Sequence, residues 1–521
     1  DRIEALMREY PGVRDVAVFS VAGKSGIEDI WAAVATIGGQ INFGELHQKC
    51  VEHFGKVAAP VDGGSEREAS GISLQGDIEF DAGTLTTITA VRNAETDWAM
   101  ASIGVPWRGG VEVIDDIVED IDTFSQELRW TSSLSGNFNY VAGLFYLNEE
   151  TERTEQFFVA APAGANGSYI NVGNEISKQE NETDSYAAYI QGDWDFAESW
   201  TLTLGARYTL DEKETESTSV NCGNLAPGFE GYPDCEGLGG SLGIIAQTFN
   251  VKADDDWSDF SPKASLQWRQ NDDVMWFATV SKGFKSGGFG GAPGTPDQAT
   301  TPVDEEIAWN YEIGMKGDFA DNTLRMNATI FYTDYEDLQI VRFGPTAANP
   351  DFGSFITDNI GSADIQGLEA EITWLPTENF RLSGTYAYLD TEVDDLILNV
   401  AAGAVDISGS DLRQAPENKA SLTASYDVPL NNGSYLSFRA DVVYSDEQIN
   451  DYANQNTIID EFTLVDMRAA WTSSDENWQF AVWGKNLTEE EYISHSYVIG
   501  PGVIGVWGAP RTYGATLTWQ M

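Results

Sequence analysis

Histidine and cysteine are the first residues to consider for chemistry, and the chain has only 3 of each among 521 residues. His47 and His53 lie six positions apart on one predicted helix, a spacing poorly suited to two ligands of one metal ion, and His495 is far away in the sequence. The sequence therefore predicts no metal site and no resident cofactor.

Two of the cysteines could react with each other. Cys222 and Cys235 bracket a segment rich in Gly and Pro. In an oxidising compartment this pair would form a loop-closing disulfide worth about 3 kcal/mol. The alternative is two unpaired thiols. The third cysteine, Cys50, lies in an N-terminal segment of different character.

Two further patterns could in principle bind ligands. Residues 283–288 are rich in Gly and carry a Lys, but they lead from a predicted strand into a loop rather than into the helix that a phosphate loop requires. The acidic runs 254–256 and 489–491 could hold divalent cations, or they could be solvated loop charge. No set of residues resembles a catalytic site, so the sequence predicts that the protein is not an enzyme.

The charge balance restricts the partners. Asp and Glu number 83 against 29 Lys and Arg, a net charge of -54, which argues against nucleic acid because phosphate binding needs a basic surface. Residues 1–60 hold 6 basic and 8 acidic residues, so the excess acid belongs to the remainder. No apolar run reaches about 18 residues, which excludes membrane-spanning helices, but a spanning strand needs only about 10.

The last strand, 511–521, shows the pattern that recurs along the chain. From Tyr513 onward apolar and polar residues alternate, so one face of the strand is apolar. Tyr513 and Trp519 share that face about 20 Å apart, as two aromatic girdles of a lipid-facing band would be. A single strand of this kind also fits a soluble sandwich.

The number of such strands favours a barrel. Short turns and long polar loops alternate between them, and charged residues such as Arg207 and Arg325 lie on the polar face, as in an outer-membrane barrel. The sequence therefore predicts an all-β protein, a large antiparallel transmembrane β-barrel preceded by a small α+β segment. The seventeen strands expected are 71–80, 83–93, 123–133, 138–149, 185–196, 200–213, 260–269, 274–285, 306–319, 323–343, 352–375, 380–393, 418–428, 434–448, 462–472, 478–487 and 511–521.

Residues 71–521 resemble the TonB-dependent outer-membrane receptors. The stretches that carry the resemblance are 125–129, 281–289, 311–316, 330–335, 359–363, 367–371, 415–419, 484–487, 491–492 and 510–514. The resemblance implies a 22-stranded barrel around a plugged lumen, of which about 17 strands are recognised here. It implies a multi-pass protein of the Gram-negative outer membrane, in contact with membrane lipid and lipopolysaccharide.

The same resemblance implies a function and further partners. Such receptors use the TonB energy-transducing system to import a scarce small-molecule ligand, with a ferric siderophore or other iron complex expected first and cobalamin or a glycan as alternatives. The outer-membrane assembly machinery would read the last strand through Tyr513, Leu517, Trp519 and Met521, the last standing where Phe is usual. Ligand contacts are expected from loop aromatics, with Phe289, Phe343, Tyr497 and Trp507 as unranked candidates.

The N-terminal part has a different pattern. Residues 1–60 predict a small αββα unit that resembles a fragment of the C-terminal subdomain of adenylate-forming enzymes, and 61–70 a polar junction. Neither a TonB box, a plug nor a signal peptide is recognised, so we expect that Asp1 is not the start of the gene product and that this chain alone does not transport. The last strand should then pair with 71–80 in a smaller ring or leave an open edge. A passive porin-like channel is the alternative function, and an adenylating fragment the second.

Overall fold

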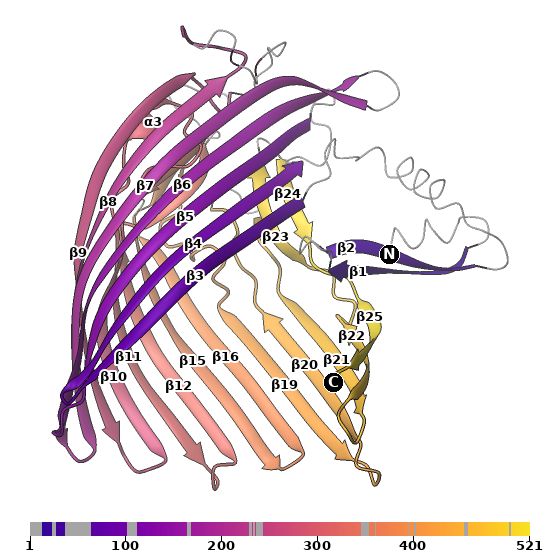
Figure 1. Cartoon of the computed structure of the whole chain (residues 1–521). Coiled ribbons are helices and arrows are strands. Elements are labelled where there is room, and N and C mark those ends of the chain that lie inside the picture. The colour runs from indigo at the N-terminus through magenta and orange to yellow at the C-terminus, as the bar shows by residue number, and fades with distance from the viewer. Residues whose placement is uncertain are drawn as a thin grey trace.

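The computed structural model contains one large antiparallel sheet. It describes residues 13–22, 28–36, 64–101, 112–163, 168–228, 232, 235, 243–344, 354–359, 361–394, 396–400, 403–452, 457–499 and 502–520. Seventeen strands follow one another around a barrel in chain order (Figure 1). They are β3 (Gly64–Phe80), β4 (Gly83–Ala101), β5 (Glu112–Ser132), β6 (Phe138–Ala163), β7 (Ser168–Ala197), β8 (Trp200–Asn221), β9 (Phe249–Arg269), β10 (Val274–Lys285), β11 (Glu306–Phe319), β12 (Leu324–Glu336), β15 (Ser362–Thr377), β16 (Phe380–Asp394), β19 (Asn418–Pro429), β20 (Tyr435–Ser445), β21 (Phe462–Thr472), β22 (Trp478–Lys485) and β25 (Thr512–Trp519).

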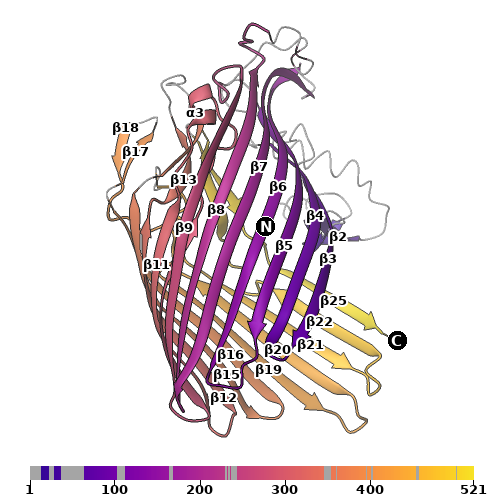
Figure 2. The same cartoon turned by 60° about the vertical axis from the view of Figure 1, so that its left-hand side comes forward.

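The predicted fold class is confirmed, and each expected strand has a counterpart among these seventeen. The observed strands differ from the predicted ones mainly in length, because β5 to β9 extend well beyond their predicted loop-side ends. Figure 2 shows these strands side by side along the tall side of the barrel. Strand β8 continues to Asn221 where a loop was expected after Lys213. The apolar alternation stops there while the backbone ladder continues, since ladder hydrogen bonds do not require apolar side chains.

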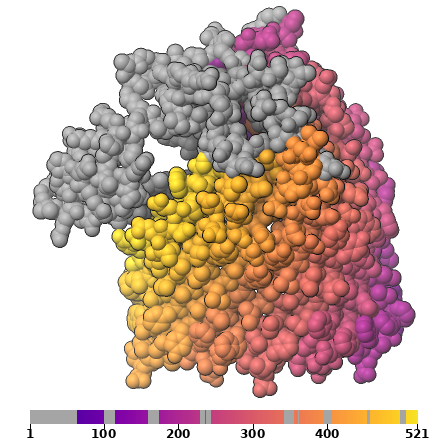
Figure 3. Space-filling view, turned by 180° about the vertical axis from the view of Figure 1, so that it is seen from behind, coloured from indigo at the N-terminus to yellow at the C-terminus, as the bar shows by residue number. Residues whose placement is uncertain are grey.

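The outer face carries an apolar band between two aromatic rows. On β8, Leu204 and Tyr208 are exposed on the side away from the lumen, above Trp200. Trp200 stacks against Trp268 of β9 at 5.7 Å between ring centroids, as one girdle should. The interval from Trp200 to Tyr208 is about 26 Å along the strand, enough to cross the apolar layer of a membrane. Figure 3 shows the wall on the opposite side as a continuous surface with the short turns at its lower rim.

Four two-stranded ladders lie outside the barrel sheet. Asp337 and Gly361 both have positive φ, 57° and 73°, and they separate a hairpin from strands that the sequence predicted to run through as 323–343 and 352–375. The ladders are β1 (Val13–Ala22) with β2 (Glu28–Thr36), β13 (Gln339–Gly344) with β14 (Ser354–Asn359), β17 (Ile397–Val400) with β18 (Gly403–Asp406), and β23 (Ile493–Ile499) with β24 (Gly502–Trp507).

Helix is scarce in the described part of the chain. The helix α3 (Pro296–Thr300) begins at Thr295, whose hydroxyl accepts a hydrogen bond from the backbone N–H of Gln298. No helix within the described ranges is long and apolar enough to cross a membrane.

The first and last strands, β3 and β25, form the weakest junction of the ring. The strand order places β25 beside β3, as in the smaller ring that the sequence analysis considered, but these two strands make far less backbone contact than any other neighbouring pair. The sixteen other neighbouring pairs have residue-by-residue registers, whereas none is defined for β25 with β3 among the described residues. This junction is therefore the least regular part of the wall.

The N-terminal region is described only in part. Strands β1 and β2 lie where the sequence predicted two short strands, while the two predicted helices fall outside the described residues. Strand β3 begins at Gly64, so most of the expected junction 61–70 is strand. The assignment of 1–60 as a separate unit stays a prediction.

The orientation of β7 can be tested with two adjacent residues. Ile190 lies on the lipid-facing side midway between Tyr186 and Trp194, and Gln191 lies on the lumen side. We expect Ile190→Arg to lower the free energy of unfolding by about 2–4 kcal/mol, because it places a charge near the bilayer midplane. Gln191→Arg should cost much less. Urea unfolding of the chain in phospholipid vesicles measures both, and equal costs would show that the faces are assigned wrongly.

Candidate functional site

The candidate site is the loop end of the barrel, where the inner faces of β6 to β9 are covered by folded loops. Polar residues such as Gln179 and Ser219 are buried there on the lumen side of β7 and β8. Buried polar groups need partners, and loop carbonyls supply them for these two residues. Three loops cover this wall, and we call them together the loop cap: the β8–β9 loop, the β10–β11 loop and the β13–β14 hairpin.

The β8–β9 loop is held by a disulfide and a carboxylate. Cys222 and Cys235 form a disulfide bond and pack with Ile176 and Val220 in one apolar cluster. Glu175 of β7 is fully buried, and its two carboxylate oxygens accept the backbone N–H groups of Gly243 at 2.6 Å and Ile245 at 2.8 Å. These contacts fix both ends of the loop to the upper ends of β7 and β8.

The β10–β11 loop lies on the same wall. Gln179 of β7 donates to the carbonyl of Gly290 at 2.9 Å, and Ser219 of β8 donates to the carbonyl of Pro293 at 3.0 Å. Lower on β8, the Lys213 ammonium donates to the carbonyl of Gly287 at 2.6 Å. The loop is thus attached along β7 and β8 at three points.

Aromatic packing supports the attachment at Lys213. Its Nζ lies 5.5 Å from the ring centroid of Trp257 on β9, a cation–π contact, and Trp257 meets Phe289 edge to face at 6.2 Å. Burial lowers the pKa of Lys213, and the nearby carboxylates of Asp211 and Glu149 oppose that shift.

The β13–β14 hairpin reaches the wall from another direction. Phe355 of β14 stacks on the buried Phe157 of β6 at 6.2 Å between ring centroids. At the base of the hairpin the buried carboxylate of Glu306 accepts the backbone N–H of Gln339 at 2.6 Å and the hydroxyl of Tyr335 at 2.7 Å. The hairpin therefore has one apolar and one charged anchor.

A second apolar cluster joins the loops on the far side of the mouth. Ile340 of β13, Val393 of β16 and Tyr452 of the β20–β21 loop are buried together with Leu396 and Ile407. In the described part of the chain, this cluster and the disulfide cluster are the two apolar cores, and both lie at the loop end. The mouth is thus a packed structure of its own.

The inner wall near Phe157 carries two carboxyl groups, those of Asp115 and Glu155, that burial affects. Asp115 of β5 lies above the lipid band, and burial raises the pKa of its carboxyl to about 7, with a further contribution from the Glu155 carboxylate. Burial also raises the pKa of Glu155, although the Arg153 guanidinium, 2.8 Å away, opposes that shift. Burial of this wall therefore stabilises the protonated form of Asp115 relative to the same carboxyl in water.

The structure describes the side chains of two of the four aromatic residues that were expected to contact a ligand. Phe289 packs on Trp257, and Trp507 is 67% exposed on β24. The side chains of Phe343 and Tyr497 lie outside the described residues, so their assignment stays a prediction.

The remaining sequence candidates are dispersed. Residues 254–256 lie exposed on β9, Glu489 pairs with Arg511 at 3.0 Å, and His495 is exposed on β23. His47 and His53 lie outside the described residues. Within the described ranges, no group of three His, Cys, Asp or Glu is arranged to hold a metal ion.

Tyr513, Leu517 and Trp519 are exposed on the outer face of β25, whereas Met521 lies outside the described residues. Their assembly role stays a prediction.

Sequence reasoning missed the residues that anchor the loop cap. Lys213, Glu175 and Glu306 were assigned to strand ends or polar loops, and their loop partners Gly287, Gly243 and Gln339 lie more than 30 residues away in the chain. The only available signal was a set of charged residues at lumen-side strand positions. That pattern is equally typical of a solvated channel wall.

Comparison with known proteins identifies the family. The sequence model of the family described as TonB dependent receptor-like, beta-barrel, matches residues 54–487, which is most of the chain. The chain belongs to this family. It is therefore an outer-membrane β-barrel related to transporters and receptors, as the sequence predicted.

Individual relatives are more distant. The metal-pseudopaline receptor CntO of Pseudomonas aeruginosa is 26% identical over 346 residues, and the probable TonB-dependent siderophore receptor PiuA of Acinetobacter baumannii is 22% identical over 320. These alignments cover 66% and 60% of this chain but 41% and 38% of the relatives, so the chain spans about two fifths of their length.

Solved structures share the fold. The ferric yersiniabactin uptake receptor FyuA of Yersinia pestis superposes with a TM-score of 0.69 at 17% identity, over 88% of this chain and 62% of that receptor. The siderophore receptor PiuA of Acinetobacter baumannii gives 0.66 at 19%, over 88% and 64%.

The disulfide can be tested by reduction. The chain-entropy model assigns a loop of this length about 3 kcal/mol, so Cys222→Ser with Cys235→Ser should increase amide hydrogen exchange of 243–248 by about tenfold or more. Dithiothreitol should reproduce the increase in the parent chain and leave the double variant unchanged. An unaltered exchange rate in the double variant would show that Glu175 alone holds the loop.

The raised pKa of Asp115 predicts a pH dependence. Its folded pKa of about 7 lies above the unfolded value near 4, so the folded wall binds the proton more strongly and loses stability as pH rises between these values. Amide exchange of β5 and β6 near Asp115, corrected for its intrinsic pH dependence, should rise by up to about a hundredfold from pH 5 to pH 8. Asp115→Asn should remove most of that rise, and an identical pH profile in the variant would contradict the assignment.

Proposed function

We propose that this chain forms the barrel wall and loop cap of an outer-membrane receptor that takes up a scarce small-molecule ligand, with a ferric siderophore or related metal complex first. In the complete protein, uptake would depend on the TonB system and not on catalysis by the chain. Two relatives are named as a metal-pseudopaline receptor and a probable siderophore receptor, which supports this ligand class. Cobalamin and glycans remain alternatives.

The observation that carries the proposal is the loop cap. A receptor must present a defined surface at its outer end, and defined loops need anchors that fix them. Here disulfide, carboxylate, ammonium and aromatic contacts attach three loops to the loop-side end of the barrel at Cys222, Glu175, Lys213 and Phe157. A passive channel would have less need of such anchors.

Phe289 is the aromatic best placed to contact a ligand. It lies in the loop cap, is partly exposed and has its ring held against Trp257. An aromatic side chain already fixed in position loses little conformational entropy when a ligand packs on it. The loop cap therefore offers at least one preorganised apolar contact.

Binding can be tested directly. Tryptophan fluorescence of the purified chain in detergent is titrated with ferric hydroxamate, catecholate and phenolate complexes, a metal complex of pseudopaline, cobalamin and oligosaccharides. We expect one metal complex to bind with a Kd of about 1 µM or tighter, and its metal-free form to bind more weakly.

Two variants locate that binding. Phe289→Ala should weaken it about tenfold through loss of a packed aromatic contact. Trp374→Ala, which alters an exposed aromatic of β15 at the lipid-facing side, should leave it unchanged. Binding of no metal complex would overturn the proposed ligand class, and equal losses in the two variants would show that the ligand does not use the loop cap.

A further inference from the structure

Two parts of the loop cap, the β10–β11 loop and the β13–β14 hairpin, contact each other as well as the wall. The β10–β11 loop is closed at its base by a bridge between Gly288 and Val303. The backbone N–H of each residue donates to the carbonyl of the other, at 3.2 Å from Gly288 and 2.8 Å from Val303. Ser286 comes just before this bridge and Asp304 just after it, so each marks one stem of the loop.

The base of the hairpin carries two amide side chains that reach these stems. Gln339 and Asn359 are opposite each other in the hairpin ladder. The Gln339 amide donates to the carbonyl of Ser286 at 3.2 Å and to the carbonyl of Asp304 at 2.8 Å. The Asn359 amide accepts the backbone N–H of Asp304 at 2.7 Å and donates to its carbonyl at 3.0 Å. We call Gln339 and Asn359 the amide clamp.

The hairpin base that carries the amide clamp is itself held. Asn359 also donates to the carbonyl of Asp337 at 2.7 Å, and the backbone N–H of Leu338 donates to the carbonyl of Gly361 at 3.2 Å. The backbone N–H of Gln339 donates to the Glu306 carboxylate, as described above. The clamp residues therefore cannot shift without moving the hairpin base.

A second contact joins the two loops near Phe289. A Cβ atom at Gly290 would lie 3.4 Å from the hydroxyl oxygen of Thr357 on β14, so the loop backbone passes close to the hairpin there. Gly290 also supplies the carbonyl that binds Gln179 of β7. The hairpin thus meets the β10–β11 loop where that loop is attached to the wall.

The clamp affects relative position more than stability. Three of its four hydrogen bonds to the β10–β11 loop are exposed to solvent, where water can replace either partner at small cost. Each loop also has its own anchor on the wall, Lys213 for the β10–β11 loop and Phe157 for the hairpin. What the clamp adds is a connection between the two anchored loops.

We propose that the amide clamp couples the β10–β11 loop to the β13–β14 hairpin, so that the two loops position Phe289 as one unit. Gln339 and Asn359 are positioning residues, because they act through the loop that carries Phe289. Coupling of this kind is reciprocal, so loosening either loop must loosen the other. One consequence rests on the proposed function: a ligand that packs on Phe289 would order the hairpin as well.

The test is amide hydrogen exchange of the detergent-purified chain without ligand, measured by mass spectrometry. Phe355→Ala removes the stacking contact with Phe157 and should raise exchange in 354–359 of the hairpin directly. Through the clamp it should also raise exchange in 287–291 of the other loop about fivefold, the change expected when one hydrogen bond is lost. Lys213→Met should have the reciprocal effect on 354–359.

Removal of the clamp should separate the two loops. The double variant Gln339→Met, Asn359→Leu keeps the side-chain size and removes both amide groups. In this background Phe355→Ala should still raise exchange in 354–359 but no longer in 287–291. A clamp that only stabilised its own surroundings would raise exchange in both loops and leave this transmission in place.

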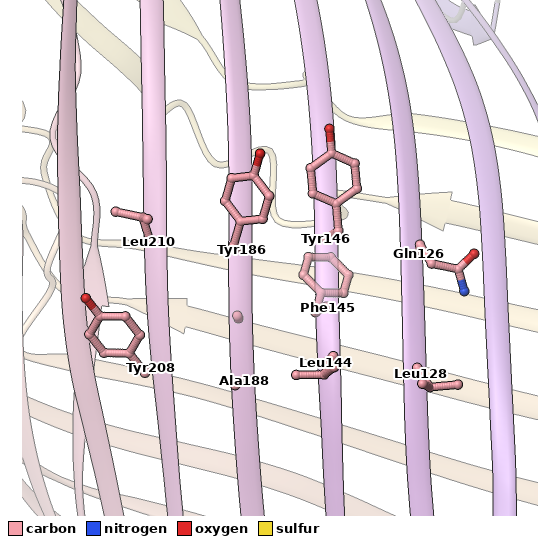
Figure 4. A pocket seen from close by; sticks show the side chains of 10 residues that line it. Gln126, Leu128, Leu144, Phe145, Tyr146, Tyr186, Ala188, Tyr208 and Leu210 are labelled. Carbon is pink, nitrogen blue, oxygen red and sulfur yellow. The ribbon is translucent and has the colours of Figure 1, made fainter.

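Two controls make matched changes outside the clamp. Gln366→Met removes an amide that donates to Asp390 at 2.8 Å and should leave the transmission intact. Tyr186→Ala removes one ring of a pair with Tyr146, 5.2 Å between centroids, in an apolar groove of about 560 Å³ on the outer wall (Figure 4). It should leave exchange in 287–291 unchanged. Heat-dependent mobility on SDS gels checks folding, and Gln339→Met alone replaces a double variant that does not fold.

Two outcomes would overturn the proposal. The first is unchanged exchange in 287–291 when Phe355→Ala is made in the parent chain, because the loops would then move independently. The second is transmission that survives loss of the clamp, because the contact of Gly290 with Thr357 would then carry it. No ligand is added, so neither outcome bears on the proposed ligand class, and a failed fluorescence titration would leave the coupling in place.

Discussion

The structure depends on one constraint, which is that backbone N–H and C=O groups inside the lipid layer have no water to bond with. The chain meets this constraint by pairing each strand with its neighbours in sequence, so sixteen ladders are made by strands that follow one another. Antiparallel neighbours joined by short turns need no crossover, and the chain direction alone sets the order. The junction of β25 with β3 is the only one that joins distant parts of the sequence, and it is the irregular one.

The same outward face of a strand meets two different solvents along its length. On β8, Leu204 and Tyr208 face lipid, and Glu212 and Glu214 continue on that face beyond the girdle, where water or headgroups surround them. The ladder hydrogen bonds are unaffected by this change. The strand can therefore leave the membrane without ending, which explains why β5 to β9 form a tall wall that supports the loops (Figure 2).

On the inner side of the wall, loops must cover polar side chains without leaving those side chains short of hydrogen bonds. The loop cap solves it with side-chain to backbone contacts, in which Gln179, Ser219 and Lys213 donate to loop carbonyls. Such contacts do not depend on the identity of the loop residue that supplies the carbonyl. Loop sequences can then vary for ligand specificity while their attachment to the wall is kept, a useful property in a receptor family with many ligands.

Sequence patterning alone predicts the fold class and the seventeen strands, and it predicts the lipid-facing side of β8, β12 and β25, because the period-two alternation follows directly from strand geometry. It also placed Cys222 and Cys235 as a possible loop-closing pair. The folded barrel decided where β8 ends, since its ladders with β7 and β9 continue after the apolar pattern stops at Lys213. It likewise decided the roles of Glu175 and Glu306, whose partners are brought to them by folding, and it placed Gln339 opposite Asn359 beside the β10–β11 loop. Register between strands, which no local pattern specifies, is the physical reason.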